Sequence, residues 1–232
     1  MQFSVDPSVF QDIDGLRLAV GWLELARQPR DEEAAASIAE PWAAAGRLDA
    51  EPIHSHPMLA PWRAVFRSLG LPPKDYLPSI EALARRARKG GDPLRVQPLV
   101  DAYNAISLRN LVPVGAFDLD KVRGDIRLGR SEGGEPFLPM GAQATETVGG
   151  GELCYLDDRG VLTRHFVWRQ SEYAKIDERT RRLFLVAELL PIAHDRADAV
   201  LSDFAHLAAQ FGGTAEVVQI DAARPATTHP IG

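Results

Sequence analysis

Cysteine is nearly absent from the chain, because Cys154 is the only one. A single cysteine cannot form a disulfide within the chain, so the sequence suits a reducing compartment. Long hydrophobic runs are also missing: no stretch approaches the roughly 18 consecutive apolar residues of a membrane-spanning helix. The first residues lack the basic start and apolar run of a secretory signal. We therefore expect a cytoplasmic protein without a membrane partner.

Positively charged residues are fewer than negatively charged ones, and the formal net charge is -6. Proteins that coat nucleic acid indiscriminately need an excess of lysine and arginine to neutralise phosphates, so this class is excluded. Local basic clusters can still provide a docking surface for a nucleic acid backbone. The candidates are a first basic group, Arg85, Arg86, Arg88 and Lys89, and a second basic group, Arg179, Arg181 and Arg182. The first lies at the end of an expected helix, where such residues also serve as ordinary partners of the helix dipole.

The usual catalytic signatures are missing. The sequence has no G-x-x-x-x-G-K-[ST] phosphate loop, no H-E-x-x-H and no G-x-S-x-G. The glycines of 133–152 do not stand between a strand and a helix, so they indicate a mobile loop rather than a dinucleotide site. His54 and His56 could offer two imidazoles, but no third ligand has a recognisable spacing, and a loop turn is the simpler explanation. We expect neither a metal nor a cofactor.

Enough apolar residues are present for a hydrophobic core, at 45% of 232 residues. Apolar residues at helical spacing predict helices over 56–70, 78–91, 96–110 and 195–213. The composition of residues 30–52 indicates an acidic, alanine-rich helical segment that Pro41 interrupts.

The strand signals lie mainly in the second half. The run 15–25 has the apolar density of a buried strand, although its length also permits a helix. Short strands separated by glycines follow residue 115, with a hairpin turn at 157–160. Helices first, clustered strands next and one closing helix indicate an α+β fold. Its sheet is expected to be curved or closed, barrel-like and packed with several helices.

A resemblance to a known family comes from residues 99–122, LVDAYNAISLRNLVPVGAFDLDKV, and the following RGDIRLGRSEGGEPF. This stretch resembles the editing and tRNA-binding domain in the β subunit of bacterial phenylalanyl-tRNA synthetase. That domain reads N-P-[LV]-V-D-[VI]-T-N-Y, then Q-P-x-H-A-F-D-x-D-K-[LI], G-x-I-x-V-R and a G-E step. The matching residues are Pro98, Val100, Asp101, Asn104, Pro113, Ala116, Phe117, Asp118, Asp120, Lys121, Gly124, Ile126, Gly134 and Glu135. The likeness covers roughly residues 97–190.

The sequence departs from that pattern at two places. Gly115 stands where the synthetase domain has a histidine that lines its editing pocket. The synthetase's G-[VI]-M-G-G stretch is replaced by HFVWRQ at 165–170, which looks like the free-standing members of the family. The sequence also carries none of the synthetase's catalytic domain. We therefore expect a free-standing relative rather than a synthetase subunit of ordinary construction.

The expected domain organisation follows from the resemblance and the element pattern. Residues 1–221 are expected to form a single domain, with a mainly helical part that contains one strand at 1–95. The family-resembling core covers 96–190, and a closing helix and strand cover 191–221. A disordered tail is expected over 222–232.

The resemblance implies a pocket that receives the 3′ end of a tRNA and hydrolyses the ester of a wrongly attached amino acid. Such an ester is already reactive, so a site mainly has to orient a water and stabilise the oxyanion. Asn104 offers amide donors and an acceptor, and Gly115 lets a ligand approach the backbone of the wall that includes Phe117. His165 could replace the missing imidazole, and Glu152 could orient water. Both also have a structural explanation, as a packed histidine and a strand-end carboxylate.

The opposite wall is expected from the second half of the hairpin. In a strand, side chains alternate between the faces. One face would then carry Arg164, Phe166, Trp168 and Gln170, and the other His165, Val167 and Arg169. Aromatic rings beside arginine suit stacking on an adenosine, and arginine suits phosphate or carboxylate recognition. The candidate substrate-binding residues on this wall are Arg164, Trp168, Arg169 and Gln170. Alternatively, Phe166 and Trp168 belong to the core, and Arg164 and Arg169 pair with Asp157, Asp158 or Glu172.

The sequence is compatible with three functions. The first is hydrolysis of a mischarged aminoacyl-tRNA in trans, and the second is a non-catalytic module of the same fold that binds tRNA or an amino acid. The third is hydrolysis of an unrelated small ester or amide. In the first two, the expected partner is tRNA or aminoacyl-tRNA and not DNA. In the family context, Asp118 and Asp120 are expected to fix the turn after Phe117 rather than to bind a metal.

Overall fold

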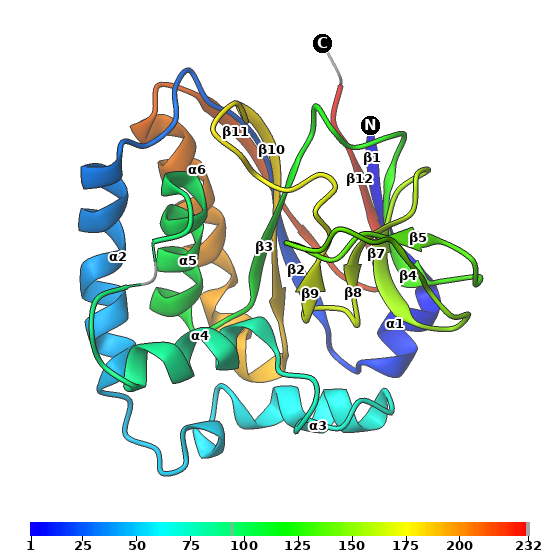
Figure 1. The fold of residues 1–232 in the computed structure, drawn as a ribbon, viewed down its shortest axis with the longest axis horizontal. Helices are drawn as coiled ribbons and strands as arrows, with labels where there is room; N and C mark the ends of the chain where they lie inside the picture. The colour runs from blue at the N-terminus through cyan, green and yellow to red at the C-terminus, as the bar shows by residue number, and fades with distance from the viewer. Residues whose placement is uncertain (94, 231–232) are drawn as a thin grey trace.

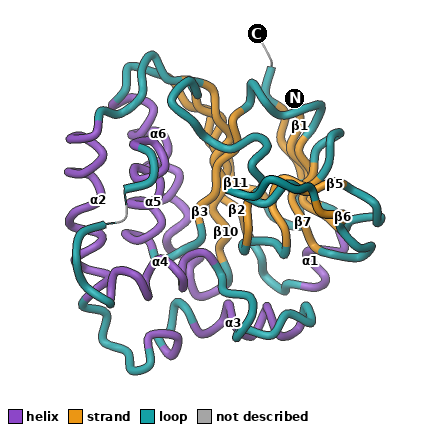
Figure 2. Tube along the Cα trace, viewed as in Figure 1, coloured by secondary structure: helices purple, strands orange, loops and turns teal. Residues whose placement is uncertain are grey.

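The computed structural model describes residues 1–93 and 95–230. Most helices gather on one side of the molecule and most strands on the other, although the short first helix lies on the strand side (Figures 1 and 2). The helices are α1 (Pro7–Asp12), α2 (Asp31–Gly46), α3 (Ala60–Ser68), α4 (Ser79–Arg88), α5 (Pro98–Asn110) and α6 (Ala197–Gln210), with short 3₁₀ helices η1 (Ile53–Ser55) and η2 (Pro191–Arg196). The helices expected over 56–70, 78–91, 96–110 and 195–213 are thus present with slightly shorter bounds.

The strands form two main sheets and one short hairpin. The larger sheet has the order β12-β1-β4-β7-β8-β9, the smaller has β11-β2-β10-β3, and β5 pairs with β6. The strands are β1 (Gln2–Val5), β2 (Arg17–Glu24), β3 (Val114–Asp118), β4 (Ile126–Arg130), β5 (Pro136–Phe137), β6 (Glu146–Thr147), β7 (Leu153–Leu156), β8 (Val161–Arg164), β9 (Arg169–Gln170), β10 (Arg182–Leu189), β11 (Thr214–Ile220) and β12 (Ala226–Thr228). The mixed α+β class is confirmed.

Neither main sheet closes into a barrel, so the expectation of a closed or barrel-like sheet is wrong. Over the described residues the larger sheet ends at β12 and β9, and the smaller ends at β11 and β3. Helix α6 packs on one face of the smaller sheet. Between the two sheets, Phe3 meets Phe184 at 4.9 Å between ring centroids, and Phe117 meets Tyr155 at 5.6 Å. Because each sheet buries a face against the other, the core forms without closure.

The open question over 15–25 is settled in favour of a strand. β2 pairs with β10 along its whole length and with β11 on its other side, so it lies inside the smaller sheet. A central strand buried on both faces is a nearly continuous hydrophobic run, which explains why its sequence shows little alternation.

Pro41 does not interrupt α2, which corrects the sequence-based expectation. The helix runs from Asp31 to Gly46 with Pro41 inside it. A proline removes one backbone hydrogen bond from a helix interior. Here Ile38 and Trp42 are buried and the helix packs along α5, so tertiary contacts offset that loss.

The tail is not disordered over the part that the structure describes, which corrects the expectation for 222–232. β12 pairs antiparallel with β1, with Phe3 opposite Thr227 and Ser4 opposite Ala226. β1 pairs in parallel with β4 on its other side, so β12 covers what would otherwise be a free sheet edge. Residues 231–232 of the expected tail lie outside the described residues. None of the described helices has the length and apolar character needed to span a membrane.

Candidate functional site

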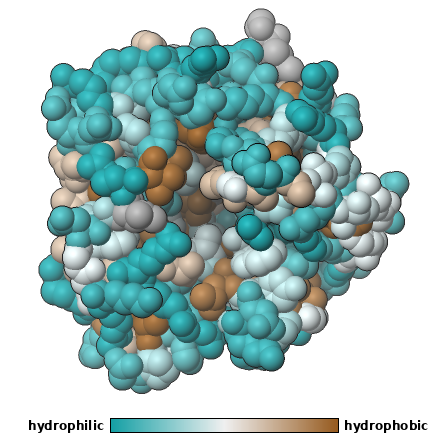
Figure 3. Space-filling model, viewed as in Figure 1, coloured by the Kyte–Doolittle hydropathy of each residue, from teal (hydrophilic) through white to brown (hydrophobic). Residues whose placement is uncertain are grey.

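A cavity of about 220 Å³, here called the central cavity, lies between the two sheets and helix α5. Helix α5, strands β3, β7, β8, β9 and β10 and the turn between β8 and β9 contribute to its wall. Among the residues that line it are Tyr103, Asn104, Gly115, Phe117, Tyr155, Phe166, Trp168, Gln170, Val186 and Glu188. On the face shown in Figure 3, a hollow with hydrophobic residues inside it separates the helical side from the strand side. The predicted residues Asn104, Gly115, Phe117, Trp168 and Gln170 are therefore brought together in one place.

Gly115 gives the central cavity part of its open space. It lies in β3 opposite Val186 of β10, and a Cβ built on it would meet no atom within 4 Å. A side chain at this position would project into free volume, where the synthetase pattern carries histidine. The chain therefore leaves open space at the position where the resemblance would place an imidazole.

Two amides border the same cavity in different ways. Gln170 Nε2 donates a 2.7 Å hydrogen bond to the carbonyl of Ala116, which ties β9 to β3. Asn104 is half-buried on α5, and within the described part of the chain its side-chain amide makes no hydrogen bond. Its donors and acceptor are therefore available to a ligand, whereas the Gln170 amide is partly used in holding the wall.

The second half of the hairpin is not one continuous strand, so the predicted alternation of its side chains is wrong. β8 ends at Arg164, and His165 and Phe166 adopt left-handed backbone conformations with φ of 47° and 65°. The chain turns over 165–168, and the Phe166 N–H donates to the Leu153 carbonyl at 2.8 Å. This turn brings Phe166, Val167 and Trp168 together into the cavity wall. Arg169 is exposed, with its guanidinium carbon 5.9 Å from the centre of the Trp168 ring.

Arg164 is not part of the cavity wall. Its Nε and Nη2 each donate to one Glu152 carboxylate oxygen at 2.8 Å, and its Nη1 donates to Glu146 at 2.8 Å. Arg164 therefore pairs with carboxylates, but with those of Glu152 and Glu146 rather than with the expected Asp157, Asp158 or Glu172. A bidentate arginine of this kind leaves little capacity for a substrate phosphate.

The predicted catalytic pair, Glu152 and His165, also lies outside the residues that line the cavity. His165 Nδ1 is 3.3 Å from Glu152 Oε1, and its ring packs against Tyr76 and Trp168. Burial alone would raise the pKa of Glu152, but the hydrogen bonds and charge of Arg164, together with contributions from His165 and Cys154, hold that pKa below its usual value. Burial lowers the pKa of His165, although the Glu152 charge opposes this. Glu152 is thus the ion-pair partner of Arg164 with His165 packed beside it, and the predicted catalytic role of Glu152 and His165 gains no support from this position.

Sequence reasoning missed a buried carboxyl group, that of Glu188. Glu188 lies near the end of β10, is 2% exposed and lines the cavity. Burial raises its pKa to about 8, although a hydrogen bond from the Tyr155 hydroxyl partly opposes that shift. The same burial raises the pKa of Tyr155, so its hydroxyl stays protonated and donates to Glu188. The signal in the sequence is a single glutamate inside the apolar run LFLVAELL.

The first basic group lies on α4, away from the cavity wall. Arg85 Nε donates to buried Glu81 at 2.8 Å. Arg88 binds the carbonyls of Leu48 and Ala50 and the carboxylate of Glu51, so it holds the chain after α2. All four members border a surface groove of about 420 Å³.

The second basic group lies at the start of β10. Arg182 pairs with Asp120, and Arg181 donates to the carbonyls of Glu178 and Thr180. The start of β10 lies beside Glu24 of β2, whereas α4 packs against α2 and η1. The structure therefore does not bring the two groups into one surface, and the role of both in nucleic acid binding stays a prediction.

The comparison with protein families shows to which family the chain belongs. A family model described as the B3/4 domain matches residues 61–204. The chain belongs to the B3/4 domain family. The resemblance to the domain of the phenylalanyl-tRNA synthetase β subunit is thereby confirmed. Every residue that lines the central cavity of this B3/4 chain falls inside the matched range.

A search of solved structures finds an N-terminal fragment of the phenylalanyl-tRNA synthetase β subunit from Pyrococcus horikoshii, with 14% sequence identity and a TM-score of 0.47. The match covers 94% of this chain and 53% of that fragment, so the B3/4 chain spans about half the length of the solved relative. No curated protein matches the chain.

Proposed function

We propose that this B3/4 chain binds the charged 3′ end of a tRNA at the central cavity and hydrolyses the aminoacyl ester in trans. The observation that carries the proposal is the position of Glu188. It combines a carboxyl group of raised pKa with a cavity formed by the residues that resemble the synthetase editing domain. A buried ionisable group of perturbed pKa in a cavity is a frequent property of catalytic sites.

The size of the cavity supports an aminoacyl group as the part of the ligand that enters. At about 220 Å³ it is smaller than the roughly 300 to 1,000 Å³ of sites for drug-sized ligands. An amino acid side chain is of suitable size, and the terminal adenosine would stay at the mouth. Phe117, Phe166 and Trp168 give the cavity an apolar lining that favours a hydrophobic side chain.

The proposed reaction is attack by a water on the ester carbonyl carbon. Glu188, in its carboxylate form, accepts a proton from the water, and the carbonyl oxygen becomes an oxyanion that the Asn104 amide can stabilise. Collapse of the tetrahedral intermediate breaks the bond to the ribose oxygen, which takes up the proton from Glu188. A general base works best when its pKa lies near the working pH, and the value of about 8 meets that condition.

A non-catalytic module is the second candidate, and the observation that favours it is Gly115. The open space beside this residue could hold part of a bound amino acid or adenosine. In that case the site would bind charged tRNA, or a free amino acid, without cleaving an ester.

The test is a deacylation time course with a panel of tRNAs that carry correct and incorrect amino acids, including tyrosine on the phenylalanine tRNA. The wild type is compared with Asn104→Ala and with Arg67→Gln, a control at an exposed position on α3. We expect faster loss of one mismatched ester than the spontaneous rate, slowed at least tenfold by Asn104→Ala and unchanged by the control. Binding of charged tRNA without cleavage of any ester would reject hydrolysis and favour the binding module.

A further inference from the structure

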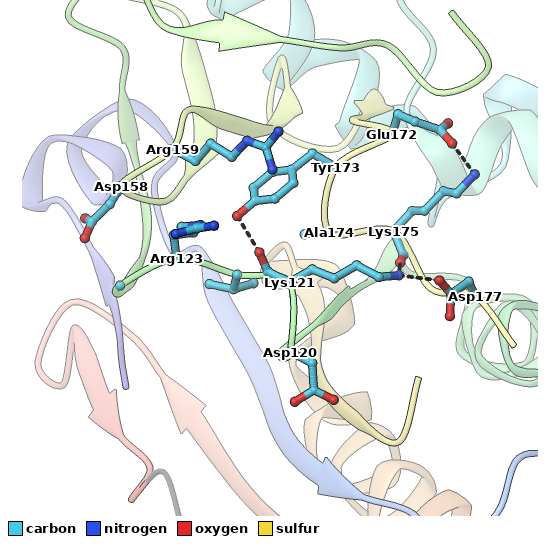
Figure 4. Close-up of a pocket in the computed structure, with 12 residues that line it drawn as sticks. Asp120, Lys121, Arg123, Asp158, Arg159, Glu172, Tyr173, Ala174, Lys175 and Asp177 are labelled. Carbon is cyan, nitrogen blue, oxygen red and sulfur yellow. Dashed lines mark hydrogen bonds and ion pairs between the residues drawn. The ribbon is translucent and has the colours of Figure 1, made fainter. Parts of the chain in front are cut away.

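A second groove, of about 730 Å³, begins just beyond the end of β3 and is here called the loop groove. Three loops form it, over 120–124, 158–159 and 172–177, and Figure 4 shows their side chains. It shares no lining residue with the central cavity. Neither the family resemblance nor the proposed reaction assigns a role to it.

The lysines of the loop groove are already neutralised. Lys121 Nζ lies 2.7 Å from Asp177 and 3.0 Å from Asp118, and Lys175 donates to Glu172. Figure 4 shows both contacts that Lys121 and Lys175 make with groove carboxylates. These lysines therefore hold the loops together and leave little positive charge for a ligand.

The two arginines of the loop groove are different, because Arg123 and Arg159 are exposed and neither pairs with a carboxylate anywhere in the described residues. Two further groove carboxylates are Asp120 and Asp158. Asp120 pairs with Arg182, and the Asp158 side chain points away from the Arg159 guanidinium in Figure 4. The positive charge that remains in the groove is thus concentrated on two guanidinium groups.

The Asp157 carboxylate fixes both arginines, because it accepts hydrogen bonds from their backbone N–H groups. One Asp157 oxygen accepts from the Arg123 N–H at 2.8 Å and from the Tyr173 hydroxyl at 3.2 Å. The other accepts from the Arg159 N–H at 2.9 Å. Arg159 stacks on the Tyr173 ring, with its guanidinium carbon 4.0 Å from the ring centroid. The loops are therefore arranged before any ligand arrives, which lowers the entropic cost of binding.

We propose that the loop groove binds the phosphates and an unstacked base of single-stranded RNA. A planar guanidinium matches phosphate geometry, and a guanidinium on an aromatic ring offers a surface on which a base can stack. The RNA is the single strand that leads to the charged 3′ end of the tRNA, an assignment that rests on the proposed function. β3 lines the central cavity at Gly115 and ends at Asp118, roughly 10 Å further along the strand, and the turn that follows reaches the groove at Asp120. One RNA strand can therefore contact both places.

The experiment measures binding of a fluorescently labelled single-stranded RNA ending in CCA, and of uncharged tRNA, by anisotropy over a series of salt concentrations. The variants are Arg123→Gln, Arg159→Gln and their combination, with Arg67→Gln as the control of equal charge change. We expect the double variant to weaken binding about tenfold or more at low salt. The slope of log affinity against log salt should fall by roughly 0.7 for each guanidinium removed. The control should bind as the wild type does.

A second pair of variants separates stacking from charge. Tyr173→Phe keeps the ring beneath Arg159 and should bind nearly as the wild type does, whereas Tyr173→Leu removes the ring and should weaken binding several-fold. Circular dichroism spectra of all variants check that the fold is retained.

The outcomes separate this proposal from the proposed function. If the double variant binds both RNAs with wild-type affinity, or the wild type binds neither at low salt, the loop groove is not an RNA site even if esters are cleaved. If the double variant loses binding while no ester is cleaved by the wild type, the groove proposal stands and the hydrolytic function fails.

Discussion

Half-buried Glu152 and buried Glu188 have opposite electrostatic surroundings. Glu152 receives two hydrogen bonds from Arg164 and a contact from His165, so its pKa is lowered and it is an ion-pair partner. Glu188 faces the central cavity without a cation beside it in the described residues, the Tyr155 hydroxyl donates to its carboxyl group, and burial raises its pKa to about 8. The same side chain thus serves stability in one place and suits proton transfer in the other. Position relative to a cation decides between the two roles.

The largest expected effect is a loss of stability with rising pH, caused by Glu188. Its pKa is raised from 4.5 to about 8 in the folded state, so its contribution to stability is present below about 4.5 and is lost as the pH rises through 8. The loss is on the order of 4 kcal/mol between those limits. Glu188→Gln cannot ionise and should remove this dependence. Urea unfolding of both proteins at pH 5, 7 and 9 measures it, and parallel curves would show that the Glu188 pKa is ordinary.

The next effect concerns Arg164, at the other glutamate. Arg164→Ala leaves the Glu152 carboxylate without its bidentate partner and should lower the free energy of unfolding by about 3 kcal/mol at pH 7. Adding Glu152→Gln to that variant removes the unpaired charge and should recover part of the loss. Denaturant unfolding of the two single variants and the double variant gives the coupling energy. A coupling near zero would contradict the ion-pair interpretation.

A smaller effect is expected at His165. Since this ring packs against Tyr76 and Trp168 and does not line the cavity, His165→Asn should change the deacylation rate by no more than about threefold. Single-turnover deacylation of the mismatched ester that the wild type cleaves measures the rate. A loss of a hundredfold or more would return His165 to the catalytic role that the sequence suggested.

The smallest effect on stability is expected at Gly115. Its Cβ would meet no atom within 4 Å, so Gly115→Ala should change the free energy of unfolding by no more than about 0.5 kcal/mol. The added methyl group projects into the cavity and should raise the KM for a charged tRNA more than it changes its kcat. Destabilisation of 2 kcal/mol or more would show that the space beside Gly115 is filled.

Local patterns predicted several parts of the molecule. The turn at 157–160 joins β7 to β8, because an Asp-Asp-Arg-Gly step between two alternating runs has the chemistry of a hairpin turn. Asp118 fixes the turn after Phe117 as expected, since its carboxylate accepts from the Asp120 N–H at 3.0 Å. Side chains that bond to their own neighbouring backbone leave this kind of signal in a single sequence.

Other parts depend on contacts between distant segments, which the sequence does not show. Nothing local predicts the left-handed backbone at His165 and Phe166, because the hydrogen bond to Leu153 that holds the turn comes from another strand. The helix through Pro41 depends on packing against α5. Glu188 falls in a run whose composition predicts a buried strand, and only the fold shows that its carboxyl reaches a cavity.

The central claim is that the buried carboxyl of Glu188 accepts the proton from the attacking water. The most direct test is the pH dependence of single-turnover deacylation between pH 6 and 9.5, with wild type and Glu188→Gln. Because the carboxylate is the active form, the wild-type rate should rise about tenfold for each pH unit and level off near pH 8. Glu188→Gln should be slower by roughly a hundredfold or more and should lack that rise. Equal rates and equal pH profiles for the two proteins would contradict the assignment.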